Sequence, residues 1–179
     1  VVTAGLWLID GLVFPDSHLI SRNLCGTVGT LFTPWNWWKF VTYGLTHDAG
    51  SPAHILLNMF TLWMFGMEVE AVYGRREFLR IYVFLLFCGG FAWAAGNVLL
   101  GSRPETQLVG ASAAVVGVVI LFVLHNPHRT VLLFFVLPTP AWVLGVFMIG
   151  YDVLSAVQRN ANDDVAYGAR LTDPHAAPA

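Results

Sequence analysis

Three polar side chains stand in otherwise apolar stretches, where they could do chemistry. Ser112 lies near the start of LVGASAAVVGVVI, two residues after Gly110, and His54 and Asn58 are four residues apart in HILLNMF. Residues four apart share one face of a helix, and both side chains are costly in lipid unless they turn inward to partners. An inward His and Asn can donate hydrogen bonds to one oxyanion, and a serine hydroxyl can act as a nucleophile. These residue types together suit acyl transfer.

Each of these residues also has a purely structural interpretation. His54 can cap a loop, and Asn58 can join two helices, as polar residues in membrane bundles often do. The Ser112 hydroxyl can bond back to the carbonyl four residues earlier. The small residues around it allow helices to approach closely; they are Gly110, Ala113 and Gly117. Taken one residue at a time, the structural interpretation is favoured.

The composition predicts a membrane protein. Of the 179 residues, 56% are hydrophobic and 11% are charged, and the mean hydropathy is +0.65. This is too apolar for an ordinary soluble domain, and the length suits about five or six helical spans. The net charge of −2 and the pI near 6.3 give no indication of nucleic-acid binding. Cys25 and Cys88 are far apart and outside any CxxC motif, so neither a disulfide framework nor a thiolate metal site is expected.

Apolar runs divide the chain into predicted spans. The first run, 1–14, contains Asp10 and is interpreted as the tail of a first span. Further runs predict four more spans, the last of them loosened around PTP at 138–140; they are 54–69, 78–100, 108–124 and 131–157. After them the sequence is polar, and no sixth hydrophobic run follows.

The connections between the spans predict how the chain sits in the membrane. Segment 15–52 is long and rich in Gly, Thr and Trp, and its PWNWWKF is typical of an aromatic cluster at headgroup level. EAVYGRREFLR carries three arginines within six residues, which predicts a cytoplasmic loop. The fourth span would rise only about 25 Å, short of a hydrocarbon core of roughly 30 Å. Ser112 is therefore predicted to meet water below the membrane surface.

Three other histidines and one acid within a predicted span have simpler interpretations. His47 is expected to be a solvated or loop-bonded residue of the first loop, and His125 and His128 to be interfacial. Asp152 lies near the end of the fifth predicted span, where it can reach interfacial water. No HExxH motif or acidic cluster indicates a metalloprotease, and no metal or organic cofactor is expected.

The order of the motifs resembles the rhomboid intramembrane serine proteases. The aromatic loop is followed by HILLN, then EVEAVYGRREF, then GASAAVVG, and the likeness runs from Trp37 to Ala169. The resemblance implies an all-α, polytopic membrane helix bundle with about five of six spans represented. It implies a rhomboid-like membrane domain over 1–169, with a partial first span, and a non-helical polar tail over 170–179.

The family's catalytic residues find matches by motif. In this family the serine of a Gly-x-Ser-Gly motif attacks the peptide bond of a transmembrane substrate, and Ser112 matches it. His54 and Asn58 match the family's oxyanion-stabilising His and Asn. The family's Trp-Arg pair in the first loop is Trp38 and Lys39 here, and lysine lacks the planar fork of arginine.

Two further positions depart more strongly from the family pattern. The glycine after the family's serine is Ala113, which narrows the room for packing against the last helix. The family's general base, a histidine that opens the sixth span, corresponds to Arg170 in AYGARLTDP. Arginine is always protonated and cannot accept the proton of the serine. His175 follows Pro174 in a polar tail with nothing to position it, so the general base is unassigned.

The resemblance implies an intramembrane serine endopeptidase that cleaves single-span membrane proteins in a lipid bilayer, without a nucleic-acid partner. The expected location is a bacterial-type plasma membrane, with residues 70–80 cytoplasmic. The alternatives are a catalytically inactive rhomboid-like protein that binds membrane clients, a truncated or frame-altered fragment of a protease and, more distantly, a small transporter.

Overall fold

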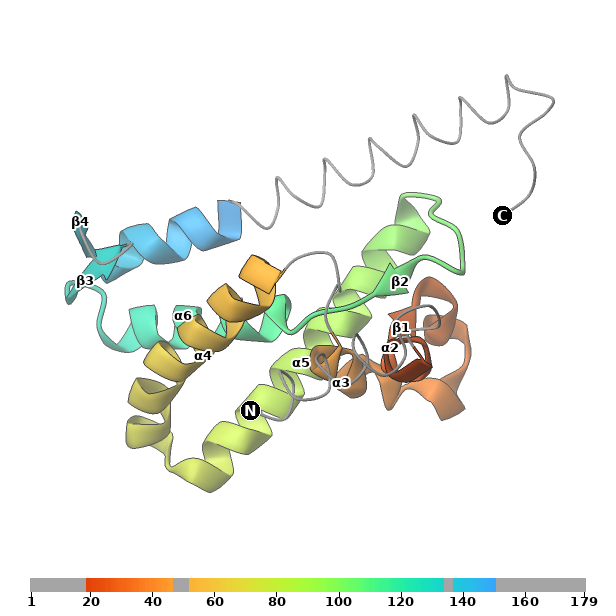
Figure 1. The fold of residues 1–179 in the computed structure, drawn as a ribbon, viewed down its shortest axis with the longest axis horizontal. Helices are drawn as coiled ribbons and strands as arrows, with labels where there is room; N and C mark the ends of the chain where they lie inside the picture. The colour runs from red at the N-terminus through yellow and green to blue at the C-terminus, as the bar shows by residue number, and fades with distance from the viewer. Residues whose placement is uncertain (1–18, 47–51, 134–136, 151–179) are drawn as a thin grey trace, which may run out of the picture. The chain divides into compact units, whose positions relative to one another are not determined.

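The computed structural model describes residues 19–46, 52–133 and 137–150, without the side chains of 19–21, 52–54 and 133 (Figure 1). Contacts within the chain divide it into a first unit, Val1–Pro127, and a second unit, His128–Ala179. The predicted first span at 1–14 lies outside the described residues.

Three helices form the framework of the first unit. They are α4 (Pro52–Tyr73), α5 (Arg75–Leu99) and α6 (Ser112–His125). Helices α4 and α5 are separated by Gly74 alone, whose φ of +80° suits a residue without a side chain. Over Ile55–Tyr73 and along all of α5, these helices are long and apolar enough to cross a membrane. The fold class is confirmed, since the protein is mostly helical and carries two candidate spans where the second and third were predicted.

Helix α6 is shorter than the predicted fourth span. It begins at Ser112 rather than at residue 108, and its 14 residues rise about 21 Å. The chain before it is extended, and Gln107–Leu108 forms strand β2. Gly110 explains the late start, because its φ of +96° is incompatible with a right-handed helix. Ser112 is consequently the first residue of the helix instead of the fifth.

The predicted long first loop is built from short elements. They are α2 (Leu19–Leu24), β1 (Gly26–Thr27), η1 (Val28–Phe32), η2 (Pro34–Asn36), α3 (Lys39–Thr42) and η3 (Tyr43–Leu45). Both α3 and η1 pack on α5. Strand β1 pairs antiparallel with β2, with Gly26 opposite Leu108. The first loop is thereby tied by backbone hydrogen bonds to the segment that leads into Ser112.

Aromatic side chains anchor the first loop on α5. The ring of Trp37 meets Phe87 and Phe91 edge-on, at 6.3 and 5.9 Å between centroids. The buried Phe40 meets the same two rings at 6.1 and 6.0 Å. Trp35, by contrast, is 76% exposed, so the headgroup location of the tryptophan cluster stays a prediction.

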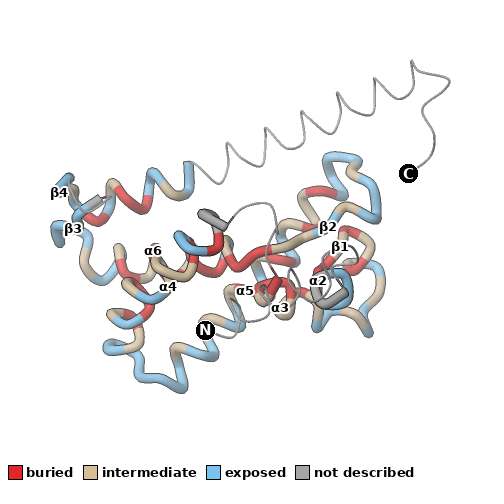
Figure 2. The backbone as a smooth tube through the Cα atoms, viewed as in Figure 1, coloured by how far each residue is buried: buried red, intermediate tan, exposed pale blue. Residues whose placement is uncertain are grey.

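Helices α4 and α6 pack side by side and run in the same direction (Figure 1). The ring of Phe65 of α4 contacts the tilted ring of Phe122 of α6 at 4.8 Å between centroids. Further along both helices the ring of Tyr73 meets His125 edge-on at 5.3 Å. Figure 2 shows buried residues gathered along α6 and the segment before it. The helix that begins with Ser112 is thus more enclosed than α4 or α5 in the part of the chain that the structure describes.

The second unit departs from the predicted fifth span of 131–157. Strands β3 (Thr130–Leu133) and β4 (Leu137–Pro140) form an antiparallel pair, and an apolar helix follows at Ala141–Gly150. The prediction of a helix from residue 131 is wrong, because the prolines at 138 and 140 lack the N–H that a helix interior needs. The end of the predicted span lies outside the described residues.

The two cysteines are free. Cys25 is buried and Cys88 is exposed. Burial raises the pKa of the Cys25 thiol, against the smaller opposing effect of Lys39. Cys25 is therefore a neutral, enclosed thiol in the first loop.

Candidate active site

Ser112 occupies the first turn of α6 with a partly buried side chain. Within the described part of the chain its hydroxyl has no hydrogen-bond partner. A bond back to the carbonyl of residue 108 is not made, because no helical turn precedes Ser112. The hydroxyl is thus free to meet a ligand.

The start of α6 also offers backbone donors. The N-cap residue is Ala111, which makes no side-chain cap. The N–H groups of the first turn have no acceptor within a helix, and a helix start favours negative charge. An oxyanion formed beside Ser112 would meet these donors.

Asn58 lies on the face of α4 that packs toward α6. It is 8% exposed, and it stands two helical turns before Phe65, which touches Phe122. At a rise of 1.5 Å per residue, Asn58 lies about 10 Å before Phe65 along α4, and His54 lies about 16 Å before it. Ser112 lies about 15 Å before Phe122 along α6. The three residues therefore occupy comparable heights on neighbouring helices. The side chain of His54 lies outside the described residues.

The small residues of α6 pack against α5. A Cβ placed on Gly89 would lie 2.9 Å from the Cβ of Ala113, and one placed on Gly117 would lie 2.7 Å from Leu85. Gly89 makes the room that the methyl group of Ala113 needs. The contact of Ala113 with the last helix, expected from the sequence, falls outside the described residues.

Gly89 and Gly96 of α5 provide a matched test of this packing. We expect Gly89→Ala to lower the free energy of unfolding by about 1–3 kcal/mol, since the new methyl overlaps a fixed Cβ that cannot rotate away. Gly96 has nothing within 4 Å, so Gly96→Ala should be neutral or stabilise by about 0.5–1 kcal/mol. Unfolding in detergent micelles measures both changes. Equal effects of the two substitutions would contradict the close approach of α5 and α6.

Tyr43 is a residue of the site that sequence analysis missed. Its side chain is 1% exposed, and its hydroxyl donates to the carbonyl oxygen of Leu86 at 3.1 Å. Its own carbonyl oxygen accepts the N–H of Gly110 at 3.2 Å. Burial raises the pKa of Tyr43 further above its ordinary value, so the hydroxyl keeps its proton and remains a donor. No sequence motif signals a contact between residues so far apart.

The comparisons with known proteins agree with this architecture. A sequence model of the Rhomboid domain matches residues 34–172, which is most of the chain. The chain belongs to the rhomboid family. No solved structure matches it.

Three curated rhomboid relatives show how far the likeness extends. The chain is 31% identical over 135 residues to RHOMBOID-like protein 12, mitochondrial, of Arabidopsis thaliana, covering 68% of this chain and 39% of that protein. It is 29% identical over 114 residues to Rhomboid protein 1, mitochondrial, of Saccharomyces cerevisiae, covering 63% and 33%. It is 27% identical over 97 residues to Rhomboid protease GluP of Bacillus subtilis, covering 54% and 18%. The aligned part is less than half the length of each of these relatives.

The names of these relatives can be compared with the membrane location that was expected from the sequence. Family membership and the apolar helices indicate an integral membrane protein. Two of the three relatives are mitochondrial by name. The expectation of a bacterial plasma membrane is therefore not supported.

The first-loop pair of this rhomboid forms a local contact. The Nζ of Lys39 lies 5.6 Å from the centroid of the Trp38 ring, within the range of a cation–π interaction. Trp38 is 49% exposed. The positive charge of Lys39 thus lies over the indole ring of the residue before it.

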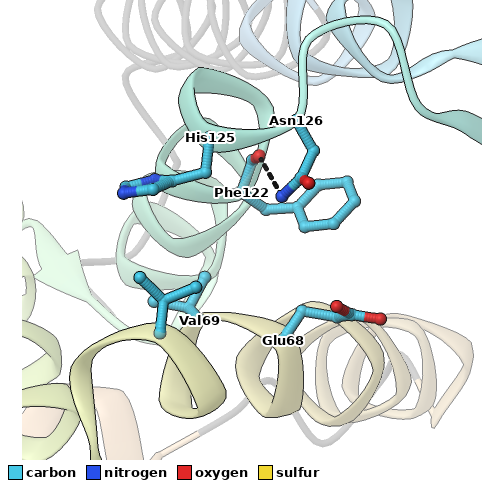
Figure 3. Close-up of a pocket in the computed structure, with 6 residues that line it drawn as sticks. Glu68, Val69, Phe122, His125 and Asn126 are labelled. Carbon is cyan, nitrogen blue, oxygen red and sulfur yellow. Dashed lines mark hydrogen bonds between the residues drawn. The ribbon is translucent and has the colours of Figure 1, made fainter.

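Figure 3 shows a pocket between α4 and α6. Its lining residues come from the last turns of both helices, whereas Ser112 is the first residue of α6. The pocket is lined by Glu68, Val69, Val72, Phe122, His125 and Asn126. His125 Nδ1 lies 2.7 Å from the carbonyl oxygen of Leu121, and its Nε2 lies 3.2 Å from the hydroxyl of Tyr73. His125 therefore joins the ends of two helices about 20 Å from Ser112, and it is not part of the candidate site.

The other titratable residues considered from the sequence fall mostly elsewhere. His128 is exposed, in the second unit. His47, Asp152, Arg170 and His175 lie outside the described residues. Among the residues that the structure describes, no group of three or more His, Cys, Asp or Glu side chains could hold a metal ion.

Proposed function

We propose that this rhomboid is an intramembrane serine endopeptidase that cleaves single-span membrane proteins, with Ser112 as its nucleophile. The observation that carries the proposal is the partly buried Ser112 hydroxyl, which has no hydrogen-bond partner within the described chain and opens the uncapped start of α6. A nucleophilic oxygen must be open to the substrate carbonyl and gains its reactivity from a base that takes its proton. An oxyanion needs hydrogen-bond donors beside it.

The chemistry begins when Ser112 Oγ attacks the carbonyl carbon of a substrate peptide bond. The carbonyl oxygen gains negative charge, which the backbone N–H of Ser112 and the side chains of His54 and Asn58 would stabilise. Each such donor is worth about 10²- to 10³-fold in kcat. The amine of the cleaved bond leaves with a proton, and water then hydrolyses the ester on Ser112.

The proton of the Ser112 hydroxyl must leave as the new bond forms. Arg170, in the position of the family's base, cannot accept it. In a serine protease of another fold, loss of the histidine base lowers kcat on the order of 10⁶-fold. We therefore expect slow turnover from this chain as long as Arg170 holds that position.

The proposed orientation puts the substrate and the water on one side of the membrane. Arg75, Arg76 and Arg80, all exposed, mark the cytoplasmic side. Ser112 lies toward the opposite end of the bundle, because α6 runs parallel to α4 and α4 ends beside these arginines. Substrate helices would enter between the bundle and the lipid and unwind beside Ser112.

Binding of membrane clients without cleavage is the second candidate function. Arg170 favours it, since a rhomboid that lacks its base can still hold a transmembrane helix. Such a protein would retain a client equally well with or without the hydroxyl of residue 112.

Covalent labelling by a fluorophosphonate separates the two functions. The reagent phosphonylates a nucleophilic serine through Oγ with release of fluoride, and mass spectrometry of the digested chain locates the group. We expect slow labelling at Ser112 of the chain reconstituted in a bilayer. A folded chain that retains a client but takes no label at Ser112 would favour the binding function.

Variants at position 170 test the role of the missing base. Arg170→His should accelerate labelling if residue 170 reaches Ser112, whereas Arg170→Gln removes the charge and supplies no base. Equal acceleration by both variants would assign the effect to the charge of Arg170.

A further inference from the structure

Tyr43 lies between α5 and the segment that leads into Ser112. Its ring packs on the glycines of α5, since a Cβ placed on Gly90 would lie 2.9 Å from Tyr43 Cε1. Its hydroxyl donates to the carbonyl oxygen of Leu86, 3.1 Å away. The ring is therefore fixed on one helix by packing and by a buried hydrogen bond.

The main chain of Tyr43 faces the other way, toward the turn before Ser112. Its carbonyl oxygen accepts the N–H of Gly110 at 3.2 Å. The same oxygen accepts the N–H and the Oγ1–H of Thr46, at 3.1 and 2.8 Å. Gly110 has a φ of +96° and stands two residues before Ser112. This hydrogen bond thus ties the turn in front of Ser112 to a residue that α5 holds in place.

Tyr43 and the residue after Ser112 also meet at one point of α5. A Cβ placed on Gly89 would lie 3.4 Å from the hydroxyl oxygen of Tyr43 and 2.9 Å from the Cβ of Ala113. Tyr43 therefore contacts the chain on both sides of Ser112. Before Ser112 it bonds to Gly110, and after Ser112 it lies beside Ala113 on the surface of Gly89.

We propose that Tyr43 is a positioning residue, which sets the place of the Ser112 hydroxyl by holding the turn at Gly110 against α5. The inference rests on the proposed function of Ser112. Tyr43 itself does not touch the reacting atoms, because its hydroxyl points to Leu86. Displacing a nucleophile by about 1 Å can cost 10²-fold in rate, so a residue that fixes the turn affects the chemical step more than substrate binding.

A cysteine at position 112 allows the position of this turn to be tested in a chain without protease activity, because the reactivity of its thiol depends on how it lies at the start of α6. The test chain carries Ser112→Cys together with Cys88→Ala, which removes the exposed native thiol; Cys25 is 2% exposed and stays. The rate of alkylation by iodoacetamide is followed against pH, in bilayers. A thiolate at a helix start has a pKa below its ordinary value.

Tyr43→Phe keeps the ring and removes only the hydroxyl, and we expect it to raise the midpoint of the pH profile. Alkylation at pH 7 should slow by about three- to tenfold, because a looser turn gives the thiolate less stabilisation from the helix start. Tyr82→Phe is the matched control. Tyr82 packs against the same buried cluster, near enough to act electrostatically on Tyr43, but its hydroxyl makes no hydrogen bond within the described chain. Its removal should leave the profile unchanged. An unchanged or lower midpoint in Tyr43→Phe would overturn the proposal.

A second measurement keeps this inference separate from the proposed function. In the chain with Ser112 intact, Tyr43→Phe should lower the maximal rate of fluorophosphonate labelling several-fold and leave the half-saturating reagent concentration unchanged. Absence of any label in the parent chain would refute the proposed function alone, and the thiol profile would still decide the role of Tyr43. A change in the half-saturating concentration alone would assign Tyr43 to reagent binding and contradict positioning.

Discussion

Ser112→Ala is expected to abolish cleavage of a single-span substrate and to remove the fluorophosphonate label. The alanine has no oxygen with which to form the acyl bond, so the substitution removes all of the covalent turnover that this chain has without a histidine base. The loss is smaller than the factor on the order of 10⁶ that a complete triad loses, because the residues of a triad act as a unit. The fold should survive, because the hydroxyl makes no hydrogen bond within the described chain. Proteoliposomes containing the enzyme and a tagged substrate measure the cleavage.

Ser102→Ala is the matched control for the loss of a hydroxyl. Ser102 lies in the connection from α5 to α6 that leads to Ser112, and its Oγ donates to Asn97 Oδ1 at 2.8 Å. This substitution should cost about 0.5–1.5 kcal/mol of stability and leave cleavage intact. Cleavage at the parent rate in Ser112→Ala would show that another group is the nucleophile.

Asn58→Ala is expected to lower kcat by about 10²- to 10³-fold, with little change in KM. An amide that stabilises an oxyanion acts where charge develops in the transition state, and it contributes little to holding the substrate helix. Because Asn58 is buried, some loss of stability will accompany the change, so rates must be divided by the fraction of folded protein.

Asn126→Ala controls for the loss of an amide on the same pair of helices. Asn126 follows the end of α6 away from Ser112, and its Nδ2 donates to the carbonyl oxygen of Phe122 at 3.4 Å. Its removal should leave kcat unchanged. A rise in KM at constant kcat in Asn58→Ala would contradict the assigned role and place Asn58 in substrate binding.

The helices could be predicted where hydrophobic length alone determines them. Helices α4 and α5 follow long apolar runs, and the arginines after Gly74 mark the turn between them. The start of α6 was placed four residues early, because the apolar run continues through Gly110 and hydropathy does not report a positive φ. The hairpin at 130–140 was missed for a similar reason, since its residues are as apolar as those of a span and only the two prolines distinguish them.

Only the residues of the candidate site that belong to sequence motifs could be predicted. The polar residues within apolar segments are easily recognised in the sequence; they are Ser112, His54 and Asn58. Tyr43 and Gly89 carry no such signal, because their importance comes from contacts with residues far away in the chain. A tyrosine in an aromatic loop and one glycine among several look ordinary until the backbone brings them to the turn before Ser112.

The structure of the fluorophosphonate adduct tests the central claim most directly. The claim is that Ser112 Oγ attacks the substrate carbonyl, and that the backbone N–H of Ser112 and the side-chain amide of Asn58 stabilise the resulting oxyanion between α4 and α6. The phosphonyl oxygen should lie about 2.7–3.1 Å from Asn58 Nδ2 and from the backbone nitrogen of Ser112. A phosphonyl group that points into lipid, or one attached to any residue other than Ser112, would contradict it.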